Sequence, residues 1–200
     1  MLTQNASDAA EKRTSPSDTR ILLAANEVYK DNPVLPLPLS SIAERANVSR
    51  ALIYSHYPDQ YALVSALIAS HVSMVWPASL EILRGDISFH DTAEKLAGLH
   101  FEHFIKHGLL LANAPQDDFL VDHLPWEFSA KLRFGLVRLA SKARRQYGFS
   151  TREAISAVLL LGVIPEQAAR LVRNRQISPD GGRRGLKRAI RVSTRTFKSE

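Results

Sequence analysis

Cysteine is absent from the 200-residue sequence. This absence excludes disulfide bonds, thiolate metal sites and cysteine nucleophiles. The first 18 residues lack a charged start followed by an apolar run, so we expect no signal peptide. We also expect no uncharged apolar stretch long enough to span a bilayer. Together these absences predict a soluble protein of the cytoplasm that makes no membrane contact.

Patterns that mark enzymes are missing as well. The sequence has no phosphate-binding glycine loop, no nucleophile elbow and no paired carboxylates at a motif spacing. We therefore expect no catalytic residues and no cofactor. No stretch alternates between apolar and polar residues as a strand would, and 45% of the residues are hydrophobic. The predicted fold class is all-α, with a globular core.

Residues 39–57 predict two short helices joined by a tight turn. Asn47 tolerates the positive φ that such a turn needs. Ser49 can cap the second helix, and Pro58 ends it. A helix of about two turns cannot hold itself together in water, so neighbours must fix it while its outer face stays exposed. This arrangement is the helix-turn-helix that fits a DNA major groove, although such a corner also occurs in ordinary helical domains.

The flanks of this stretch extend the pattern. Ile21-Leu22-x-Ala24-Ala25 precedes it, and Asp59-Gln60-x-x-Leu63-x-x-Ala66-Leu67 follows it. With Ile42-Ala43-Glu44-Arg45-Ala46 and Tyr54-x-His56-Tyr57, these segments resemble the DNA-binding head of TetR-family transcriptional repressors, over residues 19–67. The resemblance implies an N-terminal three-helix head and a larger helical body that binds ligands and dimerises.

Three regions follow from this reading. We expect residues 1–17 to form a disordered tail in which Lys12 and Arg13 could touch DNA, residues 18–67 to form the DNA-binding domain, and residues 68–200 to form the ligand-binding and dimerisation domain. We expect helices at about 19–29, in the two segments of 39–57, from Asp59 to about Met74, and at 78–84, 91–107, 126–146, 150–164 and 179–197. Ser17 or Asp18 should cap the first of these helices. Pro165 should kink the helix that begins at 150, and a helical continuation should follow it. The segment 109–124 is expected to be irregular.

The resemblance also assigns roles in DNA binding. The second helix of the motif would enter the major groove, with Ser49, Arg50, Ala51 and Ser55 facing base edges and with Tyr54 and His56 bound to phosphates. Chemistry agrees for Arg50, because a guanidinium can bond guanine O6 and N7 together. Tyr54 could instead pack beneath the first helix of the motif.

The distribution of charged residues along the chain does not support DNA binding by this motif. Residues 1–75 hold 6 Lys and Arg and 7 Asp and Glu, a net charge of −1, whereas residues 131–200 hold 17 and 4, a net charge of +13. Leu52 and Gln60 also stand where the family often has phosphate-binding residues. We therefore expect a weak salt-dependent component of DNA affinity, and the prediction of DNA binding rests on the motif alone.

The body offers a candidate ligand pocket. His100, His103 and His107 share nearly one helical face beside Phe101 and Phe104, with Trp76 and Trp126 as possible neighbours. A mostly apolar lining with a few polar groups is typical of ligand pockets. Histidines at this spacing could also hold a metal, but structural or solvated histidines are far commoner, so we predict no metal site.

Two late segments predict a homodimer. Ala154–Ile164 is apolar nearly all round, and the last helix is amphipathic, so we expect both to pack against a second copy. The function that follows is a ligand-responsive transcriptional regulator, a repressor that binds a palindromic DNA operator and is released by an unknown small apolar effector. The alternative is a helical protein that binds a small molecule or a partner and whose helix-turn-helix is only structural.

Overall fold

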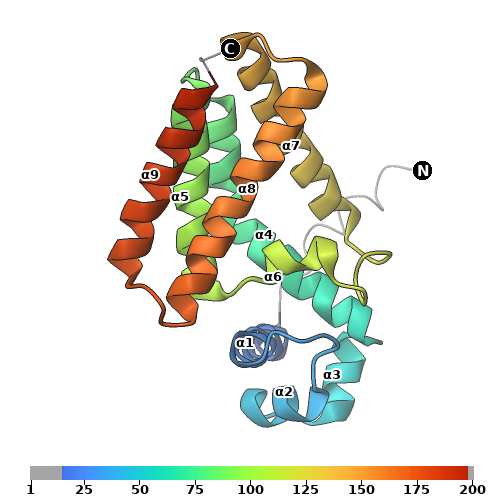
Figure 1. Cartoon of the computed structure of the whole chain (residues 1–200). Helices are drawn as coiled ribbons and strands as arrows, with labels where there is room; N and C mark the ends of the chain where they lie inside the picture. Colours follow the sequence, from blue (N-terminus) through green and yellow to red (C-terminus); the bar gives the residue numbers. More distant parts are fainter. Residues whose placement is uncertain (1–14, 198–200) are drawn as a thin grey trace, which may run out of the picture. The chain divides into compact units, whose positions relative to one another are not determined.

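The computed structural model describes residues 15–197, and the regular structure in this range is helical throughout (Figure 1). The all-α prediction is confirmed. Most of the predicted tail, including Lys12 and Arg13, lies outside the described residues. The chain divides into two compact units, of which the first ends at Leu67 and the second begins at Ile68.

The first unit contains three short helices and the beginning of a fourth. They are α1 (Pro16–Asp31), α2 (Leu39–Ala46), α3 (Arg50–His56) and the start of α4 (Gln60–Arg84). Ile21, Tyr29 and Ile42 are buried almost completely, where α1 packs against α2. This small core supports the helix-turn-helix formed by α2 and α3.

Helix α1 begins three residues earlier than predicted, and its cap is Ser15. The Ser15 hydroxyl accepts a hydrogen bond from the Asp18 N–H at 3.1 Å. Pro16 follows at the first helical position, where its missing N–H costs nothing. The prediction of Ser17 or Asp18 as the cap is therefore wrong, and both side chains are available for other contacts.

Helix α4 continues through Pro77, so the prediction of one helix ending near Met74 and another at 78–84 is wrong. A proline inside a helix removes one backbone hydrogen bond and crowds the preceding turn. Here Val72, Val75 and Leu83 are all buried on either side of the proline. Burial of this apolar face favours one helix despite the lost bond, because tertiary packing supplies most helical stability.

Helices α4 and α8 (Thr151–Arg173) are each long and apolar enough to cross a membrane by length and composition. The prediction that no stretch reaches this length is wrong, since residues 60–80 contain no Lys, Arg, Asp or Glu. Yet Leu63 and Val64 lie in the core of the first unit, and α8 packs against three other helices. Core helices of soluble proteins share this composition, so length and composition alone assign no membrane span.

The second unit is a helical bundle. After the rest of α4 come α5 (Phe89–His107), α6 (Leu110–Asn113), the 3-10 turn η1 (Ala114–Gln116), α7 (Trp126–Tyr147), α8 and α9 (Pro179–Thr196). Helices α5, α8 and α9 pack side by side, and α7 lies against α8 (Figure 1). Helix α5 starts two residues before the predicted 91 because Ser88 is its cap, and α6 with η1 occupies part of the segment predicted to be irregular.

Aromatic rings close one end of this bundle. Phe89, Tyr147, Phe149 and Phe197 pack together, with the Phe149 and Phe197 ring centroids 5.3 Å apart. Nearby, the buried Nζ of Lys142 donates to the carbonyl groups that follow α4. Burial lowers the pKa of Lys142. The start of α5 is thus tied to the ends of α4, α7 and α9.

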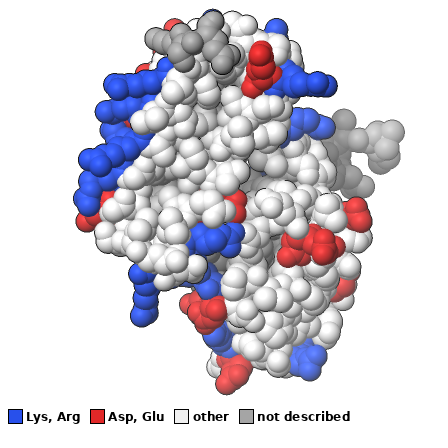
Figure 2. All heavy atoms as spheres, viewed as in Figure 1, with Lys and Arg blue, Asp and Glu red and all other residues white. Residues whose placement is uncertain are grey.

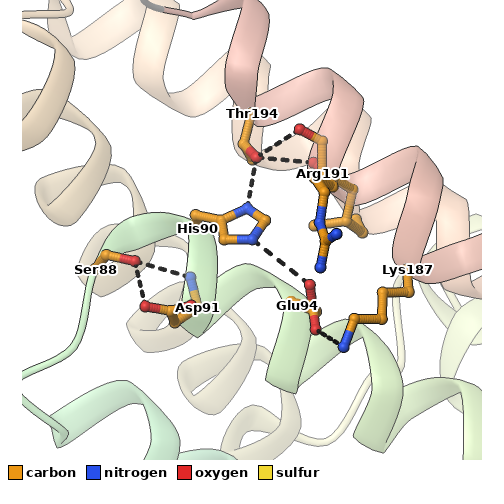
Figure 3. Close-up of polar contacts among 8 residues, drawn as sticks. Ser88, His90, Asp91, Glu94, Lys187, Arg191 and Thr194 are labelled. Carbon is orange, nitrogen blue, oxygen red and sulfur yellow. Dashed lines mark hydrogen bonds and ion pairs between the residues drawn. The ribbon is translucent and has the colours of Figure 1, made fainter.

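Polar contacts join α5 to α9 along one edge (Figure 3). His90 Nδ1 lies 2.7 Å from Thr194 Oγ1, and Glu94 lies between His90 and Lys187, whose Nζ is 2.9 Å away. Farther along, Arg183 forms an ion pair with Glu102 at 2.6 Å. Carboxylates of α5 therefore neutralise two of the basic side chains that α9 carries.

Candidate nucleic-acid interface

The turn between α2 and α3 depends on Asn47. Its φ and ψ are 51° and 55°, the left-handed conformation that asparagine tolerates better than most residues. The Asn47 N–H donates to the Glu44 carbonyl at 3.2 Å, and the Val48 N–H donates to the Ala43 carbonyl at 3.0 Å. These bonds close the end of α2 and aim the chain into α3, as the sequence predicts.

Helix α3 is fixed at its start by a cap and in its middle by one apolar side chain. Ser49 Oγ accepts a hydrogen bond from the Leu52 N–H at 3.1 Å, which confirms the predicted cap. Ile53 is 1% exposed and belongs to the core of the unit. The opposite face of α3 is left at the surface.

That exposed face carries Arg50, Ala51, Tyr54 and Ser55. Tyr54 is 48% exposed, so it does not pack beneath α2 as the alternative reading had it. Among residues 15–197, neither the Arg50 guanidinium nor the Tyr54 hydroxyl has a hydrogen-bond or ion-pair partner. A planar five-donor group and a phenolic hydroxyl are thus available to bases and phosphates.

The two serines of the predicted reading face are partly engaged within α3. Ser55 Oγ donates to the Leu52 carbonyl at 2.8 Å, which leaves its oxygen able to accept. Ser49 Oγ accepts as the cap, which leaves its proton able to donate. Each serine therefore keeps hydrogen-bonding capacity that a base edge could use.

His56 differs from the other predicted DNA-binding residues. Its Nε2 lies 3.0 Å from Ser17 Oγ, and its Nδ1 lies 3.9 Å from Asp18 Oδ1. Both ring nitrogens thus face polar atoms of α1, and the side chain is 24% exposed. A phosphate bond from His56 stays a prediction, but in this conformation its contacts lie within the unit.

Gln60, which replaces a likely phosphate donor of the resembling family, closes a loop instead. Its Nε2 donates to the Leu37 carbonyl at 2.8 Å. The preceding Asp59 accepts from the Ala62 N–H at 2.7 Å and so caps α4, as predicted. Among residues 15–67, the Lys and Arg side chains are Arg20, Lys30, Arg45 and Arg50. Most Lys and Arg side chains in view gather along the outer edge of α9 (Figure 2).

The second unit holds a group of histidines that sequence reasoning found only in part. His103 Nε2 lies 3.2 Å from Nδ1 of His71, a buried residue of α4 that the sequence did not single out. The His107 ring centroid lies 5.0 Å from that of His103 and 6.0 Å from that of His71. His100 sits one turn away, with its Nε2 3.4 Å from Ser79 Oγ.

The imidazoles of His71, His100 and His103 are neutral at physiological pH. Burial, aided by His107, lowers the pKa of His71 to about 4. Burial and the neighbouring imidazoles lower the pKa of His103 to about 3, and burial lowers that of His100 to about 4. Within the described part of the chain, no three His, Asp or Glu side chains are arranged to hold a metal ion.

The other predicted ligand residues are dispersed. Phe101 and Phe104 are core residues, and Trp76 packs edge-on against Phe134. Trp126 is 74% exposed. Two open hollows of about 400 and 490 Å³ lie at the ends of α7 and α4, and none of the seven predicted residues lines either one. Ligand binding by these residues stays a prediction.

Comparison with known proteins bears on the first unit directly. Residues 21–67 match the family described as "Bacterial regulatory proteins, tetR family". An uncharacterized HTH-type transcriptional regulator of Mycobacterium bovis is 38% identical over 56 residues, which cover 28% of this chain and 30% of that protein. Residues 21–67 are therefore similar to the N-terminal helix-turn-helix region of TetR-family regulators.

Solved TetR-family structures extend the likeness to the whole fold. A tetR-family regulatory protein from Rhodococcus RHA1 has a TM-score of 0.69 at 17% identity, covering 92% of this chain and 98% of that one. A TetR regulator from Legionella pneumophila has a TM-score of 0.65 at 16% identity, covering 90% and 98%. A TetR variant from Acinetobacter baumannii, in complex with minocycline, has a TM-score of 0.63 at 14% identity, covering 92% and 97%. At these identities the likeness concerns the fold.

Proposed function

We propose that this chain is a cytoplasmic, TetR-like transcriptional repressor that binds a palindromic DNA operator as a homodimer and is released by a small, mainly apolar effector. The observation that carries the proposal is the exposed face of α3. Arg50 and Tyr54 are presented there without partners among the described residues, on a helix held by the Ser49 cap and by Ile53. Such a face suits one major groove, with Arg50 reading a base and Tyr54 touching a phosphate.

The exposed apolar surface of α8 supports the homodimer. Leu160 is 72% exposed, Leu159 57% and Val163 46%. Few charged side chains lie over α8 in Figure 2. A row of exposed leucine and valine on one helix is costly in water and suits a two-fold contact with a second copy. Two heads in such a dimer would read half-sites about one helical turn of DNA, or somewhat more, apart.

The buried histidines support an uncharged effector. His71 and His103 are buried polar groups beside the partly exposed His107, and the lowered pKa values of His71 and His103 keep their rings neutral at pH 7. A ligand placed against neutral donors and acceptors needs hydrogen-bonding groups but no compensating charge. The minocycline complex of a protein with this fold shows that the fold can hold a small molecule. To act as an inducer, the effector must bind the DNA-free state more tightly.

Selection from a random duplex library with the full-length protein tests this proposal. We expect a palindromic sequence, and we expect sedimentation to show two protomers on each selected duplex. A compound screen against that complex should then find small uncharged molecules that release the DNA. Enrichment of no sequence would contradict DNA recognition and favour the alternative, a helical binding protein whose helix-turn-helix is only structural.

A further inference from the structure

We propose that the first turn of α1 holds the C-terminal end of α3 in the orientation that reads DNA, with Ser17 and Asp18 as positioning residues. This inference rests on the proposed function, since the orientation matters for binding only if α3 enters a groove. Neither residue lies on the predicted reading face. Their role would be to act through His56 and Tyr57, where α3 ends.

Helix α3 cannot set its own orientation. It has 7 residues, far fewer than the 12 to 15 or so that give even a marginal isolated helix. Ile53 is the one buried residue within this fully described helix. The Ser49 cap fixes the start of α3, but no apolar side chain of the helix after Ile53 fixes its end. Additional contacts are needed there.

Two adjacent hydrogen bonds supply such contacts. The Tyr57 hydroxyl donates to Asp18 Oδ1, and Ser17 Oγ shares a hydrogen bond with His56 Nε2 at 3.0 Å. In both pairs the partners are 39 positions apart in the sequence. Consecutive residues of α1 therefore meet consecutive residues at the end of α3. Two neighbouring bonds restrain the rotation of that end as well as its distance from α1.

The environment makes the tyrosine bond a strong one. Tyr57 is 7% exposed, and a buried hydroxyl is costly without a partner. Its acceptor is a carboxylate, and hydrogen bonds to charged acceptors are roughly twice as strong as neutral ones. Burial and Asp18 raise the pKa of Tyr57 far above its ordinary value, so the hydroxyl keeps its proton and stays a donor. The Asp18 carboxylate also lies 3.9 Å from His56 Nδ1.

A loosened helix end should affect the two kinds of DNA contact differently. Bonds to base edges need the donor within a few tenths of an ångström of its place, whereas a flexible side chain can follow a phosphate. The operator affinity should therefore fall more than the affinity for random DNA. A merely structural role would instead lower both affinities together, through loss of folded protein.

The experiment compares full-length variants on a selected operator duplex and on a scrambled duplex, with circular dichroism confirming that each variant is folded. We expect Tyr57→Phe and Ser17→Ala each to weaken operator binding about five- to twenty-fold, with less than a twofold change on scrambled DNA. This size corresponds to the loss of one hydrogen bond, to a carboxylate in the first variant and between neutral groups in the second. Hydrogen exchange of the Tyr57 amide, which donates to the Ile53 carbonyl at 2.8 Å, should become faster in Tyr57→Phe. Exchange of the Val48 amide in the preceding turn should not change.

Two controls isolate the Asp18 contact. Asp18→Asn and Glu27→Gln remove the same charge from α1, but Glu27 is exposed and is not bonded to α3 in the described structure. Only Asp18→Asn should reduce the operator-to-scrambled ratio. In an Asp18→Ala background, Tyr57→Phe should cause little further loss, because the two side chains act as one unit.

The outcomes separate this inference from the function on which it rests. If the wild-type protein binds no duplex selectively, the proposed function fails and the positioning role fails with it. If the wild type discriminates but Tyr57→Phe and Ser17→Ala keep the same operator-to-scrambled ratio, the positioning role is contradicted while the function stands. Equal losses on both duplexes, or an effect of Glu27→Gln equal to that of Asp18→Asn, would also contradict it.

Discussion

A Cβ atom built at Gly182 on α9 would lie 2.8 Å from Cζ of Phe101 on α5 and 2.9 Å from Cγ2 of Val172 on α8. Phe101 is completely buried, so its ring cannot turn out into solvent to make room for the added methyl group. We expect Gly182→Ala to lower the free energy of unfolding by about 1–3 kcal/mol, the usual cost of overpacking a core. Urea denaturation followed by circular dichroism measures this change.

Gly98 on α5 is the matched control, because a Cβ there meets nothing within 4 Å. Gly98→Ala should leave the free energy of unfolding unchanged or raise it by up to about 1 kcal/mol, since alanine favours a helix interior. Equal destabilisation by both substitutions would mean that the close approach of α5, α8 and α9 at Gly182 is not tight.

The histidine group predicts loss of stability in acid. The folded pKa values of His71, His100 and His103, about 4, 4 and 3, lie below the ordinary value. The unfolded chain therefore binds more protons than the folded one below a pH of about 6.5, and stability falls as pH drops from about 6.5 towards 4. Each proton taken up contributes a slope of about 1.4 kcal/mol per pH unit. Denaturation at a series of pH values measures the slope.

Replacing both members of the buried pair should flatten this profile. His71→Leu with His103→Leu removes two titrating groups and leaves neither as an unpaired partner. Val121→Ala, which removes no titratable group from an exposed position of the second unit, serves as the control and should keep the wild-type slope. A double variant with an unchanged slope between pH 6.5 and 4 would show that other groups cause the loss in acid.

Local chemistry explains why the helix-turn-helix was predictable. Asn47 supplies the turn, Ser49 caps α3 and Asp59 caps α4, and each of these roles depends only on neighbours within four residues. The spacing of apolar residues then determined which side of each helix is buried. The reading face of α3 could therefore be assigned from the sequence as whatever remained exposed.

Features that depend on distant residues were not predictable in this way. The continuation of α4 through Pro77 depends on burial supplied by other helices. His71 belongs to the histidine group only because it contacts His103, which is 32 positions away in the sequence. Ser17 and Asp18 are residue types that often cap helices, and their true partners at the end of α3 are 39 positions away. Local sequence alone therefore pointed to a capping role. A lone histidine in an apolar helix gives no signal of its own that could have identified the cluster.

The exposed face of α8 predicts how the chain assembles. Leu160→Asp should convert a dimer into a monomer that remains folded, because Leu160 is 72% exposed within one chain. Ile190 would be a poor choice for this test, since it is 1% exposed and its replacement would disrupt the core. Val121→Asp changes a comparably exposed apolar residue outside α8 and should leave the dimer intact. Sedimentation velocity at micromolar concentration distinguishes these outcomes, and a monomeric wild type would contradict the dimer.

The central claim is that the exposed face of α3 reads base sequence, and a titration of wild type, Arg50→Ala and Tyr54→Phe on operator and scrambled duplexes tests it most directly. Lys95→Ala, which removes one exposed cation from α5, serves as the charge control. We predict that Arg50→Ala costs about 1–3 kcal/mol on the operator and relaxes preference at one base pair. Tyr54→Phe should weaken both duplexes alike, and Lys95→Ala should change neither. Equal losses on both duplexes for Arg50→Ala, or a wild type that does not distinguish the duplexes, would contradict the claim.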